Sequence, residues 1–136
     1  MTERLAPPIT RLNAPFWEAA ECDRLVLPWC QTTQRFFWPP SPWSPFVMDQ
    51  DVVWREAPRD GRVIARVVFR RGFHNGLPPG PHSVVQVKLD AGPTLQAFLP
   101  DPDAERAPRV GDRVALHFVA LADGLPAIPQ AQGVTP

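Results

Sequence analysis

Alternation of apolar and polar residues over the second half of the chain is the strongest constraint on its fold. In segment 62–71 the apolar face comprises Val63, Ala65, Val67 and Phe69. Arg66 and Arg70 point the opposite way, as side chains of period two do in a half-buried strand. The same pattern recurs and predicts five short strands, over residues 52–55, 62–71, 83–90, 94–99 and 113–120.

Five short strands with one apolar face close most economically into a small barrel, because closure removes the exposed edges of an open sheet. The turn Asp90-Ala91-Gly92-Pro93 predicts a hairpin between the third and fourth strands. We therefore expect a mainly β protein with a five-stranded OB-like barrel. An SH3-like barrel or a small sandwich is the alternative, since alternation does not fix strand order. The proline-rich tail, residues 125–136, is expected to cover the barrel or a neighbour.

Before the barrel, the sequence predicts a flexible arm, a short helix and a small hairpin. Residues 1–13 show no periodicity; Asn13 is then a predicted N-cap, Pro15 lies in the first turn, and residues 16–20 form the helix. A helix this short is not stable alone, so Phe16 and Trp17 must pack on the rest of the protein or on a partner.

Residues 24–27 and 35–38 are two strand-like runs at hairpin spacing around Cys30. Four prolines follow, at positions 39, 40, 42 and 45, and they force an extended path without ladder hydrogen bonds. The segment has the shape of a zinc ribbon, two short aromatic arms around a proline-rich turn. We place the division of the chain at residues 1–50 for the arm, helix and degenerate ribbon, and 51–136 for the barrel and tail.

Composition excludes several classes of protein. The chain has 136 residues, a formal net charge of +0 and a hydrophobic fraction of 44%, which describe a globular domain with no field that attracts nucleic acid or an anionic membrane. The sequence shows no apolar run long enough to span a bilayer and no signal pattern, so a cytoplasmic location is expected. Cys22 and Cys30 are interpreted as free thiols.

No catalytic constellation is visible in the sequence. His74, His82 and His117 are the three imidazoles, and none has a carboxylate or thiol at the spacing of a triad or metal site, so no catalytic residue is assigned. The loop that holds Arg70, Arg71, Phe73 and His74 is the strongest candidate for recognition, because Gly72 and Gly76 let it approach a ligand closely. Its arginines suit the phosphates of coenzyme A, or the loop contacts a partner protein.

The order of several short motifs resembles a known family. Phe16-Trp17-Glu18, the Cys30 segment with Pro39-Pro40, Phe73-His74, the run 87–93 and Val110-Gly111-Asp112-Arg113-Val114 are similar to the zinc-ribbon and OB-fold accessory proteins of domain-of-unknown-function family 35. That resemblance implies a non-catalytic partner of a thiolase-like acyl-CoA enzyme, such as a thiolase, an acyltransferase or a lipid-transfer-protein-type aldolase.

Carried over by position, the four zinc-ligand cysteines of that family fall on Cys30, Thr33, Ser44 and Val47. A structural zinc ion needs four nitrogen or sulfur ligands, which Thr, Ser and Val do not supply. We therefore expect no zinc and no other cofactor of the chain's own, with acyl-CoA as a ligand that it contacts at most through the loop.

The function predicted is that of a scaffold subunit that stabilises an acyl-CoA enzyme and helps to shape its substrate entrance, in a hetero-oligomer without nucleic acid or membrane. The predicted partner-binding residues are Phe16, Trp17, Phe36, Trp38 and Trp43. One alternative is an OB module that binds single-stranded nucleic acid by stacking bases on its tryptophans. A second alternative is a stand-alone enzyme acting on acyl-CoA thioesters.

Overall fold

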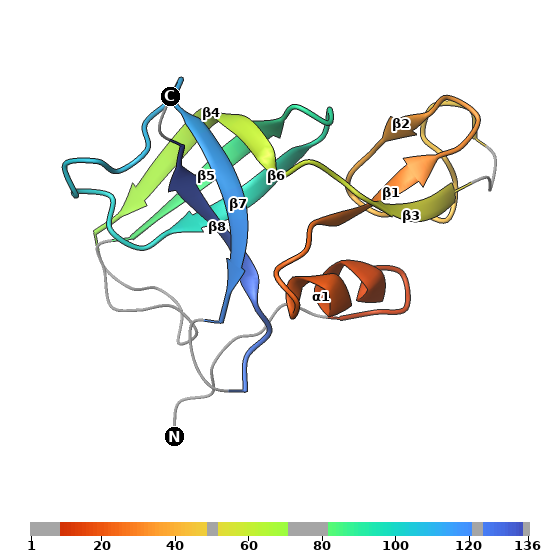
Figure 1. The fold of residues 1–136 in the computed structure, drawn as a ribbon, viewed down its shortest axis with the longest axis horizontal. Helices are drawn as coiled ribbons and strands as arrows, with labels where there is room; N and C mark the ends of the chain where they lie inside the picture. Colours follow the sequence, from red (N-terminus) through yellow and green to blue (C-terminus); the bar gives the residue numbers. More distant parts are fainter. Residues whose placement is uncertain (1–8, 49–51, 71–81, 121–123, 135–136) are drawn as a thin grey trace.

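A computed structural model describes residues 9–48, 52–70, 82–120 and 124–134 of the chain. Within these residues the strands form two sheets, accompanied by one short helix (Figure 1). The elements are α1 (Ala14–Ala20), β1 (Val26–Cys30), β2 (Arg35–Phe36), β3 (Val52–Glu56), β4 (Asp60–Phe69), β5 (His82–Leu89), β6 (Thr94–Leu99), β7 (Arg113–Val119) and β8 (Ile128–Gly133). Figure 1 shows the larger sheet at one end of the molecule and the smaller one at the other.

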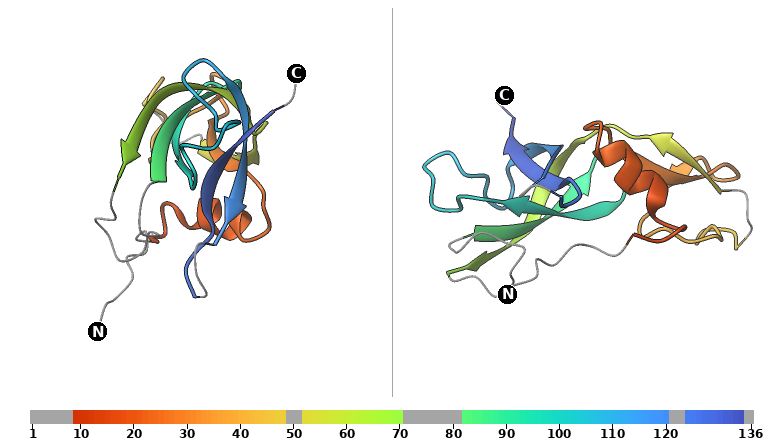
Figure 2. Two further views of the ribbon diagram at one scale, coloured as in Figure 1. Left: turned by 90° about the vertical axis from the view of Figure 1, so that its left-hand side faces the viewer. Right: turned by 90° about the horizontal axis from the view of Figure 1, so that it is seen from below.

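The larger sheet is a closed barrel with strand order β4-β5-β6-β8-β7. Its neighbours run antiparallel except β6 and β8, which are parallel where Phe98 lies opposite Gln130. Seen from its end, the barrel curves around a common interior (Figure 2, left). That interior is filled by inward side chains from all five strands: Val63, Val85, Val87, Leu89, Leu95, Ala97, Leu99, Val114, Leu116, Phe118 and Ala131. The predicted mainly β fold with an OB-like barrel is confirmed.

One of the five strands was assigned wrongly from the sequence. Strand β3 does not belong to the barrel: it pairs with β1 along five residue pairs, from Val26 opposite Glu56 to Cys30 opposite Val52. The fifth barrel strand is β8, in the tail that was expected only to cover the barrel. Alternation shows which residues face inward but not which strands pair, and Pro129 made the tail look unlike a strand.

The alternation predicted for β4 is correct at Val63 and reverses beyond it. A bulge between Val63 and Ala65 shifts the register, so that Arg66 lies opposite the buried Val85, and Val67 is 56% exposed. A bulge adds one residue to a strand, which exchanges its two faces from that point on. Arg66 is partly buried, and its guanidinium donates hydrogen bonds to the carbonyl oxygens of Pro102 and Pro108.

The smaller sheet, with order β2-β1-β3, is the ribbon-like unit and is called the ribbon sheet below. Its β1–β2 hairpin pairs Trp29 with Phe36 and Cys30 with Arg35. Helix α1 starts at Ala14, earlier than predicted, with Pro15 in its first turn. Figure 2 (right) shows α1 beside the connection between the ribbon sheet and the barrel. Buried residues of the helix, the ribbon sheet and the barrel belong to one hydrophobic cluster, which includes Phe16, Leu27 and Val87.

Among the residues that the structure describes, α1 is the longest helix, and no helix has the length and apolar character needed to cross a membrane.

Candidate partner-binding surface

The predicted partner-binding aromatics are split between the interior of the chain and its surface. Phe16 is only 2% exposed, with its ring centroid 5.0 Å from that of Trp17, 4.7 Å from Trp38 and 5.6 Å from Phe118. Trp17 and Trp38 are half-buried. Phe16 therefore joins the helix, the ribbon sheet and the barrel, and the two tryptophans beside it keep part of their surface open to solvent.

Phe36 and Trp43 lie on the ribbon sheet and its following loop. Phe36 is half-buried, with its ring 4.6 Å from that of Trp29, whereas Trp43 is 47% exposed. Val47 and Met48 follow Trp43 closely in the sequence and are 40% and 72% exposed. We call Trp43, Val47 and Met48 the ribbon tip. Large apolar side chains that remain exposed together often mark a surface for another protein.

Two grooves border these aromatics. The helix groove, about 620 Å³, lies between the helix and ribbon on one side and the barrel on the other; it is lined by Phe16, Trp17, Trp38, Pro39, Gln86, Thr94, Leu95, Gln96 and Pro129. The ribbon groove, about 360 Å³, lies between the ribbon aromatics and the β5–β6 turn, with Arg35 and Lys88 among its lining residues. Residues of the ribbon region and of the barrel line each groove, so a partner segment bound there would contact both parts of the chain.

The predicted coenzyme A loop falls largely outside the described residues, which include Arg70 but not Arg71, Phe73 or His74. Arg70 Nη1 lies 2.6 Å from Asp103 Oδ2, in an exposed ion pair that ties the end of β4 to the β6–β7 loop. The structure therefore places Arg70 at the rim of the barrel, and the rest of this site stays a prediction.

The positions corresponding to zinc ligands lie on two turns of the ribbon. Cys30 and Ser44 are both 0% exposed, and the backbone N–H of Thr33 donates to Cys30 Sγ at 3.5 Å. Burial raises the pKa of the Cys30 thiol, but the nearby hydroxyl groups of Ser44 and Thr33 and the backbone N–H groups of Thr33 and Thr32 outweigh it and hold that pKa below its ordinary value. The described part of the chain contains no cluster of three His, Cys, Asp or Glu side chains able to hold a metal ion.

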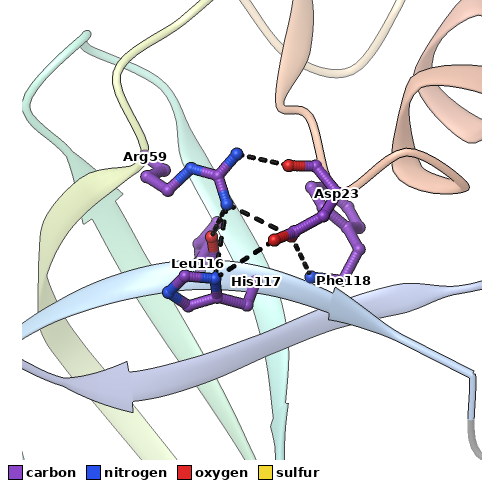
Figure 3. Close-up of polar contacts among 5 residues, drawn as sticks. All are labelled: Asp23, Arg59, Leu116, His117 and Phe118. Atoms are coloured by element: carbon purple, nitrogen blue, oxygen red, sulfur yellow. Dashed lines mark hydrogen bonds and ion pairs between the residues drawn. The ribbon is translucent and has the colours of Figure 1, made fainter.

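A polar cluster that the sequence did not reveal joins helix α1 to the barrel (Figure 3). Asp23 Oδ1 accepts the backbone N–H of Phe118 at 2.9 Å and pairs with Arg59 Nη1 at 3.1 Å. Its Oδ2 lies 3.4 Å from His117 Nδ1, and Arg59 also donates to the carbonyl oxygens of Asp23 and Leu116. His117, an imidazole for which the sequence offered no partner, thus belongs to an intramolecular contact between the segment after helix α1 and the barrel.

The pKa of Asp23 is lowered chiefly by the hydrogen bond from the Phe118 backbone; burial opposes this shift, and His117 and Arg59 add to it. Asp23 adopts a positive φ of 53°, a conformation that Asp and Asn tolerate better than most residues. The only sequence signal for this cluster is an acidic residue just after a short helix, which does not identify distant partners on β7.

Comparison with known proteins agrees with this architecture. Residues 54–119 match the family model of the ChsH2 C-terminal OB-fold domain. A solved chain of the Ltp2-ChsH2(DUF35) aldolase is 28% identical with a TM-score of 0.80, and the similarity covers 95% of this chain and 99% of that chain. No curated protein matches the sequence. The resemblance inferred from the motif order is confirmed: these findings support a likeness to the OB-fold proteins of domain-of-unknown-function family 35.

Proposed function

We propose that this chain is a non-catalytic accessory subunit of a thiolase-like acyl-CoA enzyme of the lipid-transfer-protein type. The observation that carries the proposal is the similarity to a chain of the Ltp2-ChsH2(DUF35) aldolase, which extends over 99% of that chain and includes the ribbon sheet as well as the barrel. Because the similarity includes both ribbon and barrel, the shared feature is the fold of the whole subunit rather than of one domain.

The ribbon tip is the surface that suits a partner best. Trp43, Val47 and Met48 are each at least 40% exposed, and they follow one another within six residues of chain. Tryptophan and methionine are enriched at protein interfaces, where one large aromatic side chain often supplies much of the binding energy. The half-buried Trp17 and Trp38, which line the helix groove, extend the same kind of surface toward the barrel.

The proposal includes a role at the substrate entrance of the partner. Arg70 stands at the barrel rim beside the loop that also holds Arg71, Phe73 and His74. Guanidinium groups bind phosphates through paired hydrogen bonds, so a loop of this composition suits the phosphates of coenzyme A if the partner brings them near.

The first test is co-expression with a thiolase-like enzyme of the lipid-transfer-protein type, followed by size-exclusion chromatography with light scattering. A stable hetero-oligomer and a rise in enzyme activity or stability are expected. Two proteins that elute separately, with an enzyme equally active alone, would remove the proposal. The non-catalytic role is tested with the subunit alone, which should show no turnover of the acyl-CoA substrate.

A second experiment locates the interface. Trp43→Ala and Met48→Asp in the ribbon tip should weaken binding to the partner about tenfold or more, since truncation of an aromatic anchor costs above about 1.4 kcal/mol. Val67→Asp is the matched control, because Val67 is also exposed and apolar, at 56%, but lies on β4 of the barrel. Equal losses in all three variants would show that the ribbon tip is not the binding surface.

The contacts of Trp29 do not favour the nucleic-acid alternative. The Phe36 ring lies 4.6 Å from the Trp29 ring, and the guanidinium carbon of Arg55 lies 4.5 Å from its centroid. A base-stacking platform needs an accessible ring face and a positive groove, and the formal net charge of the chain is +0.

A further inference from the structure

The two turns of the ribbon that correspond to zinc-binding turns each fold around one buried polar side chain. In the first turn, the Thr33 backbone N–H donates to Cys30 Sγ at 3.5 Å. In the second, the Phe46 backbone N–H donates to Ser44 Oγ at 3.2 Å, and the Met48 N–H donates to the Ser44 carbonyl oxygen at 2.8 Å. Both central residues, Cys30 and Ser44, are 0% exposed.

These residues do not fit a zinc ion. Of the four corresponding positions, Cys30 alone offers a thiolate; Thr33 and Ser44 offer neutral hydroxyls, and Val47 offers no donor and is 40% exposed. Thr33 Oγ1 is buried without a hydrogen-bond partner of good geometry among the described atoms, so its effect on the thiol is that of a nearby dipole. The turns must therefore be joined by something other than a metal.

We propose that the ribbon sheet folds without a metal ion and that the hydrogen bonds within its two turns, together with the aromatic side chains around them, hold its shape instead. A hydroxyl has one proton to donate and two lone pairs. Ser44 Oγ accepts the Phe46 N–H with a lone pair, and Cys30 Sγ accepts the Thr33 N–H, so each buried side chain fixes the backbone of its own turn.

Aromatic side chains shield these turns from water. Phe37 is 5% exposed, and its ring lies 6.3 Å from that of Phe46, whose face is covered by the Arg35 guanidinium at 3.8 Å. Exclusion of water strengthens a buried hydrogen bond and makes its loss costly, because the partner left behind finds no replacement. The aromatic cover and the hydrogen bonds of the two turns together supply what the metal supplies in a zinc ribbon.

Metal content tests the first half of the proposal. The full chain, expressed in zinc-supplemented medium, is expected to purify with far less than one equivalent of zinc by elemental analysis. Addition of EDTA should leave its melting temperature unchanged. One equivalent of bound zinc, or a ribbon that unfolds when EDTA is added, would overturn the proposal.

Ser44→Ala tests the second half. Loss of one buried hydrogen bond should lower the melting temperature by about 3–5 °C. Ser41→Ala is the matched control: Ser41 Oγ accepts the Trp43 N–H at 3.2 Å, as Ser44 Oγ accepts that of Phe46, but Ser41 is not buried. Its melting temperature should fall by no more than about 1–2 °C.

Equal effects of Ser44→Ala and Ser41→Ala on the melting temperature would show that the buried Ser44 hydroxyl does not hold its turn.

Discussion

At the scale of single residues, Asp23 binds the segment that follows helix α1 to the barrel. It accepts the backbone N–H of Phe118 and pairs with Arg59 and His117. Arg59 and strand β7 are both far from Asp23 in the sequence, and no sequence motif connects them to it. Sequence analysis could find the candidate histidine, His117, but not its role, because the role depends on which strand lies beside the end of the helix.

Asp23 should make the stability of the protein sensitive to acid. The pKa of Asp23 in the folded protein is lowered, chiefly by the Phe118 N–H. The ionised carboxylate therefore adds to the free energy of unfolding in full above the unfolded pKa of about 3.9, and this contribution is lost as the pH falls through the folded pKa. In Asp23→Asn, which keeps an acceptor and tolerates the positive φ, the stability difference from wild type should shrink as the pH falls from about 7 to about 3. Melting curves across that range would measure it.

If the melting temperatures of wild type and Asp23→Asn differ by the same amount at every pH, the charge of Asp23 does not contribute to stability. Asp23→Ala is the informative companion variant, because it also removes the acceptor of the Phe118 N–H. It should be less stable than Asp23→Asn at every pH, by roughly 1–3 kcal/mol if that N–H is left without a partner.

Gly61 is a second residue whose importance appears only in the fold. It pairs with Leu89 on β5 and with Val114 on β7, where the barrel closes. A Cβ added there would lie 2.5 Å from the Lys88 carbonyl oxygen and 2.8 Å from Val87 Cγ1. Gly61→Ala should therefore reduce the free energy of unfolding by about 1–3 kcal/mol or more, because backbone must move to admit the methyl group.

Urea denaturation would measure the loss, with Gly133→Ala as the control. The nearest atom to a Cβ at Gly133 in β8 is Pro108 Cγ at 4.0 Å, so that change should stay within about 0.5 kcal/mol. Comparable losses at the two glycines would mean that crowding at Gly61 is relieved by a small shift of the strands.

At the scale of elements, alternation predicted four of the barrel strands and the β5–β6 hairpin. It did not predict strand β8 or the order in which the strands pair. Strand β8 includes Pro129, yet it pairs with β7 from Val119 opposite Ile128 to Val114 opposite Gly133. Pattern reasoning also lost the register of β4 at the bulge near Ile64, because a single added residue exchanges the faces of a strand without any composition signal.

Strand β8 should be indispensable for the barrel. Without it, β6 and β7 each lose one of their two neighbours, the barrel is no longer closed, and the buried Ala131 is removed from the core. A chain that ends at Ala127 should therefore fail to fold, whereas one that ends at Val134 should keep native stability. Far-UV circular dichroism and gel filtration would distinguish them; a folded, monomeric shorter chain would show that four strands suffice.

At the scale of the whole molecule, contacts around Phe16 and Asp23 are among those that join the helix, ribbon sheet and barrel. All five tryptophans, at positions 17, 29, 38, 43 and 54, lie in the helix, the ribbon sheet or the ribbon loop, and none lies in a barrel strand. Tryptophan fluorescence therefore reports the helix and ribbon, while the circular dichroism of the sheet reports chiefly the barrel. The two signals can be followed separately in one unfolding experiment.

In the wild-type protein both signals should change in one transition, because the Phe16 ring packs against Trp38 of the ribbon and Phe118 of the barrel. Phe16→Ala removes both contacts from a site that is 2% exposed, at a cost of about 3–5 kcal/mol. The fluorescence midpoint should then fall further than the circular dichroism midpoint, because the barrel keeps its own core while the ribbon loses its support. Leu12→Ala, at a position that is 42% exposed, should move neither midpoint. If Phe16→Ala lowers the fluorescence and circular dichroism midpoints equally, the ribbon and barrel unfold as one unit. Other contacts, such as the Asp23 cluster, are then sufficient to hold them together.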